Sequence, residues 1–377
     1  MKKLISQLID CEQKRKTLVR IPKETTLKNI YIILSLILYS LIYSQEKIEI
    51  PFTYENNLIN IQIGVNGKKE HFIFDTGARN VLTKKFADES HFKLKDGRKI
   101  GGYKGKTESF KTDVKLITIQ NKDLNDVSFI VLDWEFLNQL NISGIVGVEF
   151  FTDLGYQKFM IDYKSKKIIL GTELPVSPEY KFKMVKKGYP RILMKNEKFL
   201  IDTGNPLFGE ISESILANNA NCTKYTISSL SITNKHIDLC NIILPDEKNV
   251  NFNFQSFKIK NSRNVIGNLT LQNFIIYFDI ENKEFYLNEN KFFSTLKDIW
   301  FLNNNIGYIV SVINENSELY NLGIREGFYL TEINNKKVTE FLDGQEINFY
   351  LLNHKNMVLK FKNMDNIEIT ETVSEIK

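Results

Sequence analysis

One arrangement of residues occurs twice in this chain of 377 residues, and it limits what the chain can fold into. An apolar stretch runs directly into an Asp-Thr-Gly triplet at Asp75–Gly77, and again at Asp202–Gly204. Each triplet is followed by two aliphatic residues and a glycine. These end at Gly147 in the first copy and at Gly267 in the second, 72 and 65 residues after the aspartate. Two copies of one unit therefore occupy positions 46–290.

Short stretches with a period of two predict that both copies consist of β-strands. Residues 59–65 alternate between isoleucine or valine and other residues, and end at the turn Asn66-Gly67. Such a pattern is typical of a strand with one buried face. Residues 71–74 form a second apolar stretch that leads straight into the first triplet. Long helical patterns are scarce, and two prolines within 175–178 separate the copies. We expect a mainly β fold.

The basic excess of the chain is confined to its leader. Residues 1–44 hold eight Lys or Arg and three acidic residues, so the remainder holds 42 basic and 42 acidic residues. No basic stripe is left to follow a phosphate backbone, and we expect no nucleic-acid partner. The apolar run 30–43 and the following Ser44 fit a secretory signal peptide. An uncleaved N-terminal membrane anchor is the alternative, although a span needs about 20 residues. Under both interpretations, residues 45–377 are expected to be exported to the periplasm or the cell surface.

Cysteine and histidine usage is sparse beyond the leader. Cys222 and Cys240 are the two cysteines that remain there, and in an oxidising compartment they could close one disulfide loop. Two separate buried thiols are the alternative. The wide spacing of these cysteines and the four scattered histidines give no metal-site signature, so we expect no metal and no other cofactor.

A single Asp-Thr-Gly triplet is commonly only a turn, in which the aspartate accepts a bond from a nearby backbone N–H. Here both triplets end an apolar strand, and the same residue types follow each at a similar distance. This repetition favours a functional interpretation. Two carboxylates held about 3 Å apart cannot both ionise, so Asp75 and Asp202 would share one proton. The ionised carboxylate could then take a proton from water, while the protonated one donates to a scissile carbonyl.

The other triplet residues suit the same chemistry. Gly77 and Gly204 allow the backbone to turn sharply and approach closely. The hydroxyl groups of Thr76 and Thr203 can bond across the interface to the backbone of the other copy, and so hold the two carboxylates near one plane.

These paired motifs resemble the retropepsin-like aspartic proteases in their single-chain, two-lobe bacterial form. Residues 145–147 and 265–267 match the aliphatic-aliphatic-Gly strand that crosses beneath each triplet in that family. The resemblance covers about 46–290 and implies two pepsin- or retropepsin-like β-barrel lobes, at 45–175 and 176–291. It also implies that Asp75 and Asp202 form the catalytic dyad, that Thr76 and Thr203 form the interlobe grip, and that a polypeptide substrate binds as an extended strand. Because both lobes belong to one chain, we expect a monomer.

Two features differ between the copies. The residue after the triplet is Ala78 in the first copy, as the family allows, but Asn205 in the second, which the family does not usually have. The absence of a hydroxyl at Ala78 removes one hydrogen bond to ionised Asp75, so we expect the dyad to work at milder pH than a digestive acid protease. Gly101, Gly102 and Tyr103 are a candidate flap over the cleft; an ordinary glycine-rich turn is the alternative. The second copy has no comparable glycine cluster, and we expect one flap.

Residues 296–372 resemble a PDZ domain, with α+β character, of the kind attached to exported bacterial proteases. The resemblance places candidate peptide-binding positions at Gly307, Tyr308, Ile309 and Val310, where a peptide could add as a strand with its C-terminal carboxylate on backbone N–H groups. A small domain that only packs on the protease is the alternative. The whole chain is therefore predicted to be an exported aspartic endopeptidase. A catalytically inactive peptide-binding scaffold is the alternative, but the intact pair of aspartates favours the enzyme.

Overall fold

The computed structural model describes residues 46–102, 105–186, 189–216, 221–229, 232–260, 263–290, 296–304 and 306–377. The predicted leader, 1–44, lies outside these residues. Within them, no helix combines the length and the apolar character needed to cross a membrane. Residues 47–377 form one compact unit, so the domain boundaries proposed from the sequence stay predictions.

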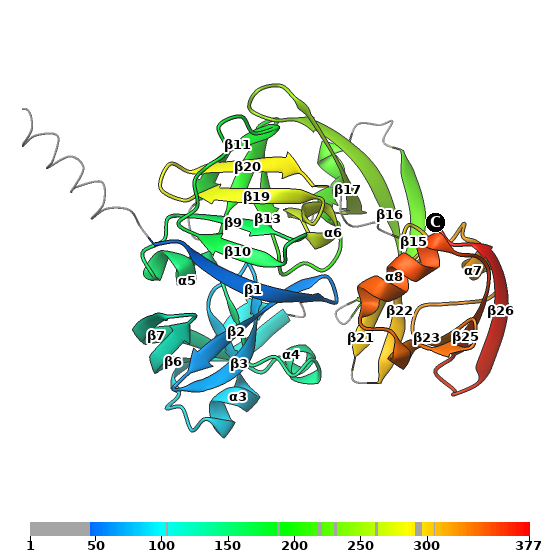
Figure 1. The fold of residues 1–377 in the computed structure, drawn as a ribbon, viewed down its shortest axis with the longest axis horizontal. Coiled ribbons are helices and arrows are strands. Elements are labelled where there is room, and N and C mark those ends of the chain that lie inside the picture. Colours follow the sequence, from blue (N-terminus) through cyan, green and yellow to red (C-terminus); the bar gives the residue numbers. More distant parts are fainter. Residues whose placement is uncertain are drawn as a thin grey trace, which may run out of the picture. The chain divides into compact units, whose positions relative to one another are not determined.

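The prediction of a mainly β fold is confirmed (Figure 1). The elements up to the prolines that separate the copies are β1 (Ile48–Glu55), β2 (Leu58–Val65), β3 (Lys68–Phe74), β4 (Val81–Thr83), α3 (Lys84–Glu89), β5 (Lys95–Gly102), β6 (Gly105–Ile119), β7 (Lys122–Leu132), α4 (Glu135–Gln139), β8 (Gly144–Val146), α5 (Val148–Asp153), β9 (Lys158–Asp162) and β10 (Lys167–Leu170).

The second copy has a closely similar order of elements. They are β11 (Tyr180–Lys186), β12 (Arg191–Met194), β13 (Glu197–Ile201), β14 (Gly209–Ser212), η1 (Glu213–Ile215), β15 (Cys222–Ser229), β16 (Ile232–Pro245), β17 (Asn251–Ile259), β18 (Asn264–Ile266), α6 (Asn268–Leu271), β19 (Phe274–Asp279) and β20 (Glu284–Glu289).

The C-terminal part has a different order. Its elements are β21 (Ile299–Asn304), β22 (Gly307–Asn314), α7 (Glu318–Asn321), β23 (Tyr329–Ile333), β24 (Lys336–Lys337), η2 (Val338–Glu340), α8 (Gly344–Asn353), β25 (Lys355–Lys362) and β26 (Glu368–Glu375). We call these residues, 296–377, the C-terminal unit. They enclose a hydrophobic cluster of their own, which includes Leu319, Leu330 and Phe361.

The strand pairing of the first copy is repeated in the second. In the first copy β3 pairs in parallel with β8, β4 pairs antiparallel with β8, and β4 pairs in parallel with β7. In the second copy β13, β14, β17 and β18 make the same three pairings in the same directions. Each triplet therefore follows a strand whose parallel neighbour is the aliphatic strand that ends at Gly147 or Gly267.

A continuous antiparallel sheet joins the copies. Its strand order is β1, β10, β9, β19, β20 and β11, and the central pair brings Ile161 opposite Ile276. Figure 1 shows β20, β19, β9 and β10 side by side, one below another. The edge strand β1 alternates in burial, with Ile48, Ile50, Phe52 and Tyr54 inside, as expected for a strand with one face on a core. The main hydrophobic cluster runs through both copies.

Candidate active site

The two aspartates stand at equivalent points of the repeated pairing. Asp75 directly follows β3, and its backbone N–H donates to the carbonyl of Val146 in β8, at 3.0 Å. Asp202 directly follows β13, and its N–H donates to the carbonyl of Ile266 in β18, also at 3.0 Å. The apolar residues before each aspartate, such as Phe74 and Ile201, are fully buried. Each carboxylate is therefore carried by a strand end that is anchored in the core.

The threonines of the two triplets bind the opposite copy reciprocally. The Oγ1 of Thr76 donates to the carbonyl of Ile201 at 2.6 Å, and the Oγ1 of Thr203 donates to the carbonyl of Phe74 at 2.8 Å. Each hydroxyl also accepts the backbone N–H of the other threonine, at 3.0 and 3.1 Å. Both threonine residues are completely buried. Four hydrogen bonds thus hold the two triplets against each other.

The glycines allow the carboxylates to meet. A Cβ atom on Gly204 would lie 2.1 Å from Oδ2 of Asp75, and one on Gly77 would lie 2.7 Å from Cγ of Asp202. Each glycine also donates its backbone N–H to the Oδ1 of its own aspartate, at 2.7 Å for Asp75 and 3.0 Å for Asp202. Any side chain at either glycine would push the two aspartates apart.

The two carboxyl groups differ in their affinity for a proton. Burial raises the pKa of Asp75, although a hydrogen bond from the Asp202 carboxyl and backbone N–H groups lower it in part. Burial also raises the pKa of Asp202, to well above its usual value, and the negative charge of Asp75 raises it further. The pair therefore favours an ionised Asp75 beside a protonated Asp202 when one proton is shared, as expected for like charges that share a site.

The residues after the triplets, Ala78 and Asn205, each contribute a backbone N–H that lowers the pKa of the aspartate in their own copy. The Oδ1 of Asn205 accepts the N–H of Leu207 at 2.9 Å, so its carboxamide closes its own turn. In the first copy it is Asn80 that makes a comparable contact, with its Oδ1 on the N–H of Gly147 at 3.1 Å.

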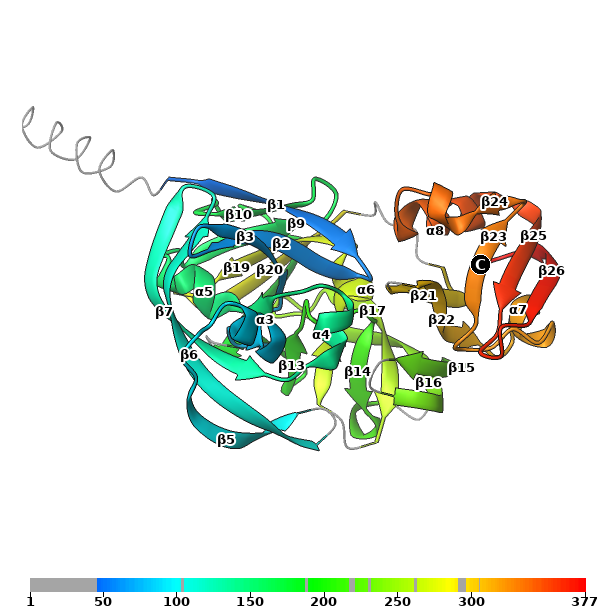
Figure 2. The same cartoon turned by 90° about the horizontal axis from the view of Figure 1, so that it is seen from below.

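The candidate flap is a β-hairpin. Gly101 and Gly102 end β5, and Gly102 is paired with Gly105 at the start of β6. Tyr103 lies outside the described residues. Figure 2 shows this hairpin extending beyond the body of the first copy. By its place in the repeat, its counterpart in the second copy is the hairpin of β15 and β16, which the sequence did not reveal because it has no glycine cluster.

The hairpin of β15 and β16 is bound to the C-terminal unit. β15 pairs with β22, so that Thr226 lies opposite Ile313. The buried hydroxyl of Thr226 donates to Glu326 at 2.9 Å, and the ring of Tyr225 lies 5.3 Å from that of Trp300. These rings belong to a hydrophobic cluster shared by the second copy and the C-terminal unit.

The structure places the predicted cysteine pair at the base of this hairpin. Cys222 and Cys240 lie directly opposite each other in β15 and β16, with their Cα atoms 4.0 Å apart, and they form a disulfide. The bond ties together the two strands that pair with the C-terminal unit on one side and with β17 on the other.

The candidate peptide-binding positions Gly307, Tyr308, Ile309 and Val310 form the first half of β22. Tyr308 and Ile309 pair with β21 on one side of β22 and with β23 on the other. Because both edges are occupied, a peptide could add as a strand at these positions only if β21 or β23 left. Among the described strands, β21 pairs with β22 alone.

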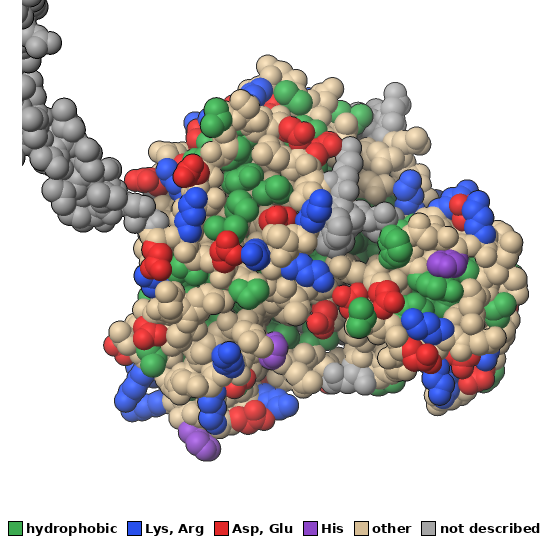
Figure 3. All heavy atoms as spheres, in the orientation of Figure 1, with side chains coloured by type: hydrophobic (Ala, Val, Ile, Leu, Met, Phe, Trp, Pro, Cys, Tyr) green, Lys and Arg blue, Asp and Glu red, His purple; other side chains and the backbone are tan. Residues whose placement is uncertain are grey.

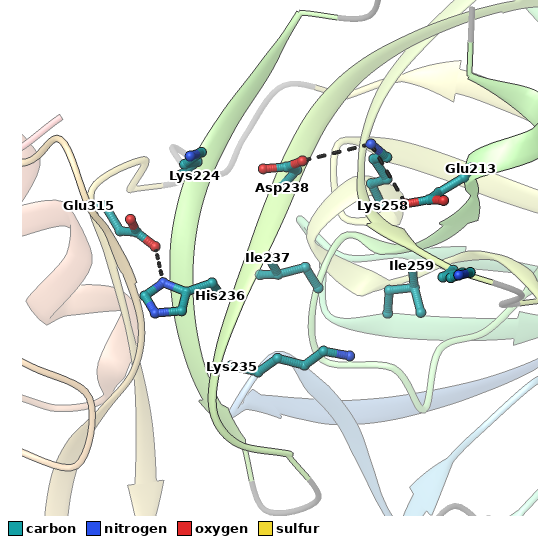
Figure 4. A pocket seen from close by; sticks show the side chains of 10 residues that line it. Glu213, Lys224, Lys235, His236, Ile237, Asp238, Lys258, Ile259 and Glu315 are labelled. Carbon is teal, nitrogen blue, oxygen red and sulfur yellow. Dashed lines mark hydrogen bonds and ion pairs between the residues drawn. The ribbon is translucent and has the colours of Figure 1, made fainter.

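A surface hollow of about 520 Å³ lies beside the same hairpin (Figure 4). Among its lining residues, Lys258 lies 3.7 Å from Glu213 and 3.9 Å from Asp238, and His236 lies 2.6 Å from Glu315. Lys224, Lys235 and Lys260 also line it. Neither aspartate of the dyad lines it, and we assign it no ligand. Elsewhere on the face shown in Figure 3, basic and acidic side chains also lie close together.

Across the described ranges, His, Cys, Asp and Glu side chains do not gather in groups of three or more that could hold a metal ion.

Residues 61–150 match the family model described as aspartyl protease. The matched segment, about a quarter of the chain, contains the Asp75 triplet and the strand that ends at Gly147. No curated protein matches the chain. This segment is therefore similar to aspartyl proteases, and the mainly β fold is consistent with such a protein.

One residue of the site was missed at the sequence level. Asn268, which directly follows Gly267, is completely buried and donates its Nδ2 to the carbonyl of Thr203 at 2.5 Å. The signal was present in the repeat, since the equivalent residue after Gly147 is the apolar Val148.

Proposed function

We propose that this protein is an aspartic endopeptidase whose dyad is Asp75 and Asp202. The observation that carries the proposal is the reciprocal bonding of Thr76 and Thr203, because it brings two buried carboxylates from equivalent strand ends together. If the triplets were only turns, the four hydrogen bonds that join them across more than a hundred positions of sequence would have no purpose.

The different proton affinities supply the two roles that hydrolysis needs. Ionised Asp75 takes a proton from a water molecule held between the carboxyl groups, and the water oxygen attacks the scissile carbonyl carbon. Protonated Asp202 donates its proton to the carbonyl oxygen, which gives a neutral tetrahedral intermediate. Asp75 then gives the proton that it took from water to the leaving nitrogen, Asp202 takes one hydroxyl proton of the intermediate, and the C–N bond breaks to give a carboxylic acid and an amine. General acid and general base act together, and no covalent enzyme intermediate forms.

We propose that the substrate is a polypeptide bound as an extended strand between two lobes, 45–175 and 176–291, with the hairpin at Gly101–Tyr103 as a flap. The repeated strand pairing supports two lobes. We further propose that 296–372 is a PDZ-like domain that binds peptide or regulates access. Its pairing with β15 supports regulation, because β15 belongs to the hairpin that corresponds to the flap. Export to the periplasm or cell surface, as a monomer, completes the proposal and agrees with the disulfide.

Activity should depend on pH as a bell-shaped curve with its maximum at mildly acidic pH. Activity rises as Asp75 ionises, and burial places its pKa above the usual value of about 3.9. Activity falls again when Asp202 loses the shared proton, and the pKa of Asp202 is raised well above its usual value. The test is kcat/KM on a fluorogenic peptide library from about pH 3 to about pH 8. A maximum below about pH 3 would contradict the raised pKa of Asp75. No cleavage by the wild-type protein at any pH in this range would overturn the proposed activity and leave the inactive scaffold.

A further inference from the structure

The side-chain carboxamide of Asn268 is hydrogen-bonded through both its nitrogen and its oxygen in the interior of the protein. It opens α6 and is completely buried. Its Nδ2 donates to the carbonyl of Thr203 at 2.5 Å and to the carbonyl of Asn57 at 2.7 Å, and its Oδ1 accepts the hydroxyl of Tyr163 at 2.5 Å. Its backbone N–H donates to the carbonyl of Asn205 at 2.9 Å. A single side chain therefore connects the Asp202 triplet with two segments of the first copy.

The first copy has nothing similar. Val148 stands at the equivalent position, and its side chain has no polar atom. The Thr203 carbonyl of the second triplet is thus bound by the side chain of Asn268, which has no polar equivalent at position 148 of the first copy. The carboxyl group that this triplet carries, Asp202, is also the one with the more strongly raised pKa.

The groups that hold Asn268 are themselves fixed. Tyr163 is fully buried, lies 5.3 Å from Tyr54 and 6.0 Å from Phe52 between ring centroids, and burial raises its pKa so that its hydroxyl remains a donor. Asn57 belongs to the two-residue turn between β1 and β2, in which Asn56 and Asn57 have φ values of 54° and 57°. Such values are those of a tight type I′ hairpin turn, and Asn is one of the few residues that adopt them readily.

The same turn also contacts the C-terminal unit. The Nδ2 of Asn56 donates to the carbonyl of Asn303 at 2.9 Å, and its Oδ1 accepts the N–H of Asn303 at 2.6 Å. The carboxamide of Asn56 therefore makes the pair of hydrogen bonds with the backbone of Asn303 that the backbone of a neighbouring strand would make. A continuous series of hydrogen bonds and one peptide link runs from Asn303 through Asn56, Asn57 and Asn268 to Thr203.

We propose that Asn268 is a positioning residue of the active site, which holds the Asp202 triplet through the Thr203 carbonyl and makes its geometry depend on the Asn56–Asn57 turn. This inference rests on the proposed protease function. Without Asn268, the Thr203 carbonyl loses a buried partner and the plane of the triplet is free to tilt. The two carboxyl groups then share their proton less well, so Asp202 gives it up at lower pH.

The test compares Asn268→Leu with Asn273→Leu. Asn273 lies two residues beyond the end of α6, and its Nδ2 donates to the carbonyls of Leu269 and Thr270, so it controls for damage to the end of this helix. In Asn268→Leu we expect kcat to fall about 10- to 100-fold with KM little changed. The alkaline limb of the pH profile should move to lower pH. Asn273→Leu should keep the wild-type profile, and equal profiles in the two variants would overturn the proposal.

A readout without substrate separates this inference from the proposed function. In the wild type, both raised carboxyl pKa values make the folded state bind more protons than the unfolded state, so stability falls as pH rises above about pH 4. In Asn268→Leu this fall should end at lower pH, because Asp202 loses its proton earlier. If the wild type is inactive but the shift is seen, the proposed activity fails and the positioning role stands. If the wild type is active and no shift is seen, the positioning role fails.

Two milder variants keep the proposal testable if Asn268→Leu does not fold. Tyr163→Phe removes the one donor to the Asn268 oxygen, and a smaller shift of the alkaline limb in the same direction is expected. Asn56→Gly deletes the contact with Asn303 but keeps the positive φ. Its control is Asn66→Gly, at the same position of the turn after β2, where φ is 49°. We expect a shift for Asn56→Gly and none for Asn66→Gly. A wild-type profile in both Tyr163→Phe and Asn56→Gly would overturn the proposal.

Discussion

Replacement of either Asp75 or Asp202 by asparagine is expected to lower kcat/KM by about 10⁴-fold or more, the size of effect seen when a catalytic group is removed. Asparagine matches aspartate in shape, but it can neither take a proton from water nor donate a carboxyl proton. The measurement is hydrolysis of a peptide library at the optimal pH, with products identified by mass spectrometry. Asp75→Asn removes a charge that burial makes costly, and Asp202→Asn replaces a carboxyl group that holds the shared proton with a neutral amide of the same shape. Neither variant should therefore unfold more easily than the wild type at neutral pH.

The matched control for this prediction is Asp162→Asn. Asp162 also ends a strand, β9, but its carboxylate accepts the N–H groups of Lys164 and Ser165 at 3.0 and 3.3 Å and so closes an ordinary turn. We expect this variant to cleave peptides as the wild type does, with at most a loss of stability. Unchanged cleavage in Asp75→Asn or in Asp202→Asn would remove the corresponding residue from the dyad.

Features that depend on short stretches of sequence could be predicted. The strand that leads into Asp75 was recognised because its apolar residues are contiguous, and residues 68–74 form β3. The alternation at 59–65 likewise corresponds to β2, and the turn Asn66-Gly67 has the positive φ values that these residues favour. The two triplets were matched by their place in the repeat, and the structure brings them together.

Features that depend on pairing between distant strands could not be predicted from the sequence. Whether Cys222 faces Cys240 depends on the register of β15 and β16, which one residue of slip would change. The edges of β22 are filled by β21 and β23, and no local pattern tells which strands lie beside it. No role could be assigned to Asn268 from the sequence for a related reason. Its significance depends on Tyr163 and Asn57, which are more than a hundred residues away.

Replacement of Thr203 by valine should lower the free energy of unfolding strongly. Valine keeps the shape of threonine but lacks the hydroxyl, so the carbonyl of Phe74 and the N–H of Thr76 lose their partner. Both threonine residues are completely buried, so water cannot replace the bond. A buried polar group without a partner costs about 1–3 kcal/mol, and two of them predict a loss of about 2–5 kcal/mol in the free energy of unfolding. Chemical denaturation at neutral pH measures this loss.

Thr203→Ser is the control, because serine keeps the hydroxyl and loses only a methyl group, at a cost of about 1 kcal/mol. Thr76→Val should resemble Thr203→Val, since it leaves the carbonyl of Ile201 and the N–H of Thr203 without a partner. The double variant distinguishes a joint contact from two independent ones. If the four bonds together hold the two triplets in place, breaking one pair already loosens the other, and the double variant loses less than the sum of the single losses. Strictly additive losses, with peptide cleavage retained in both single variants, would mean that the threonines stabilise the fold without positioning the carboxylates.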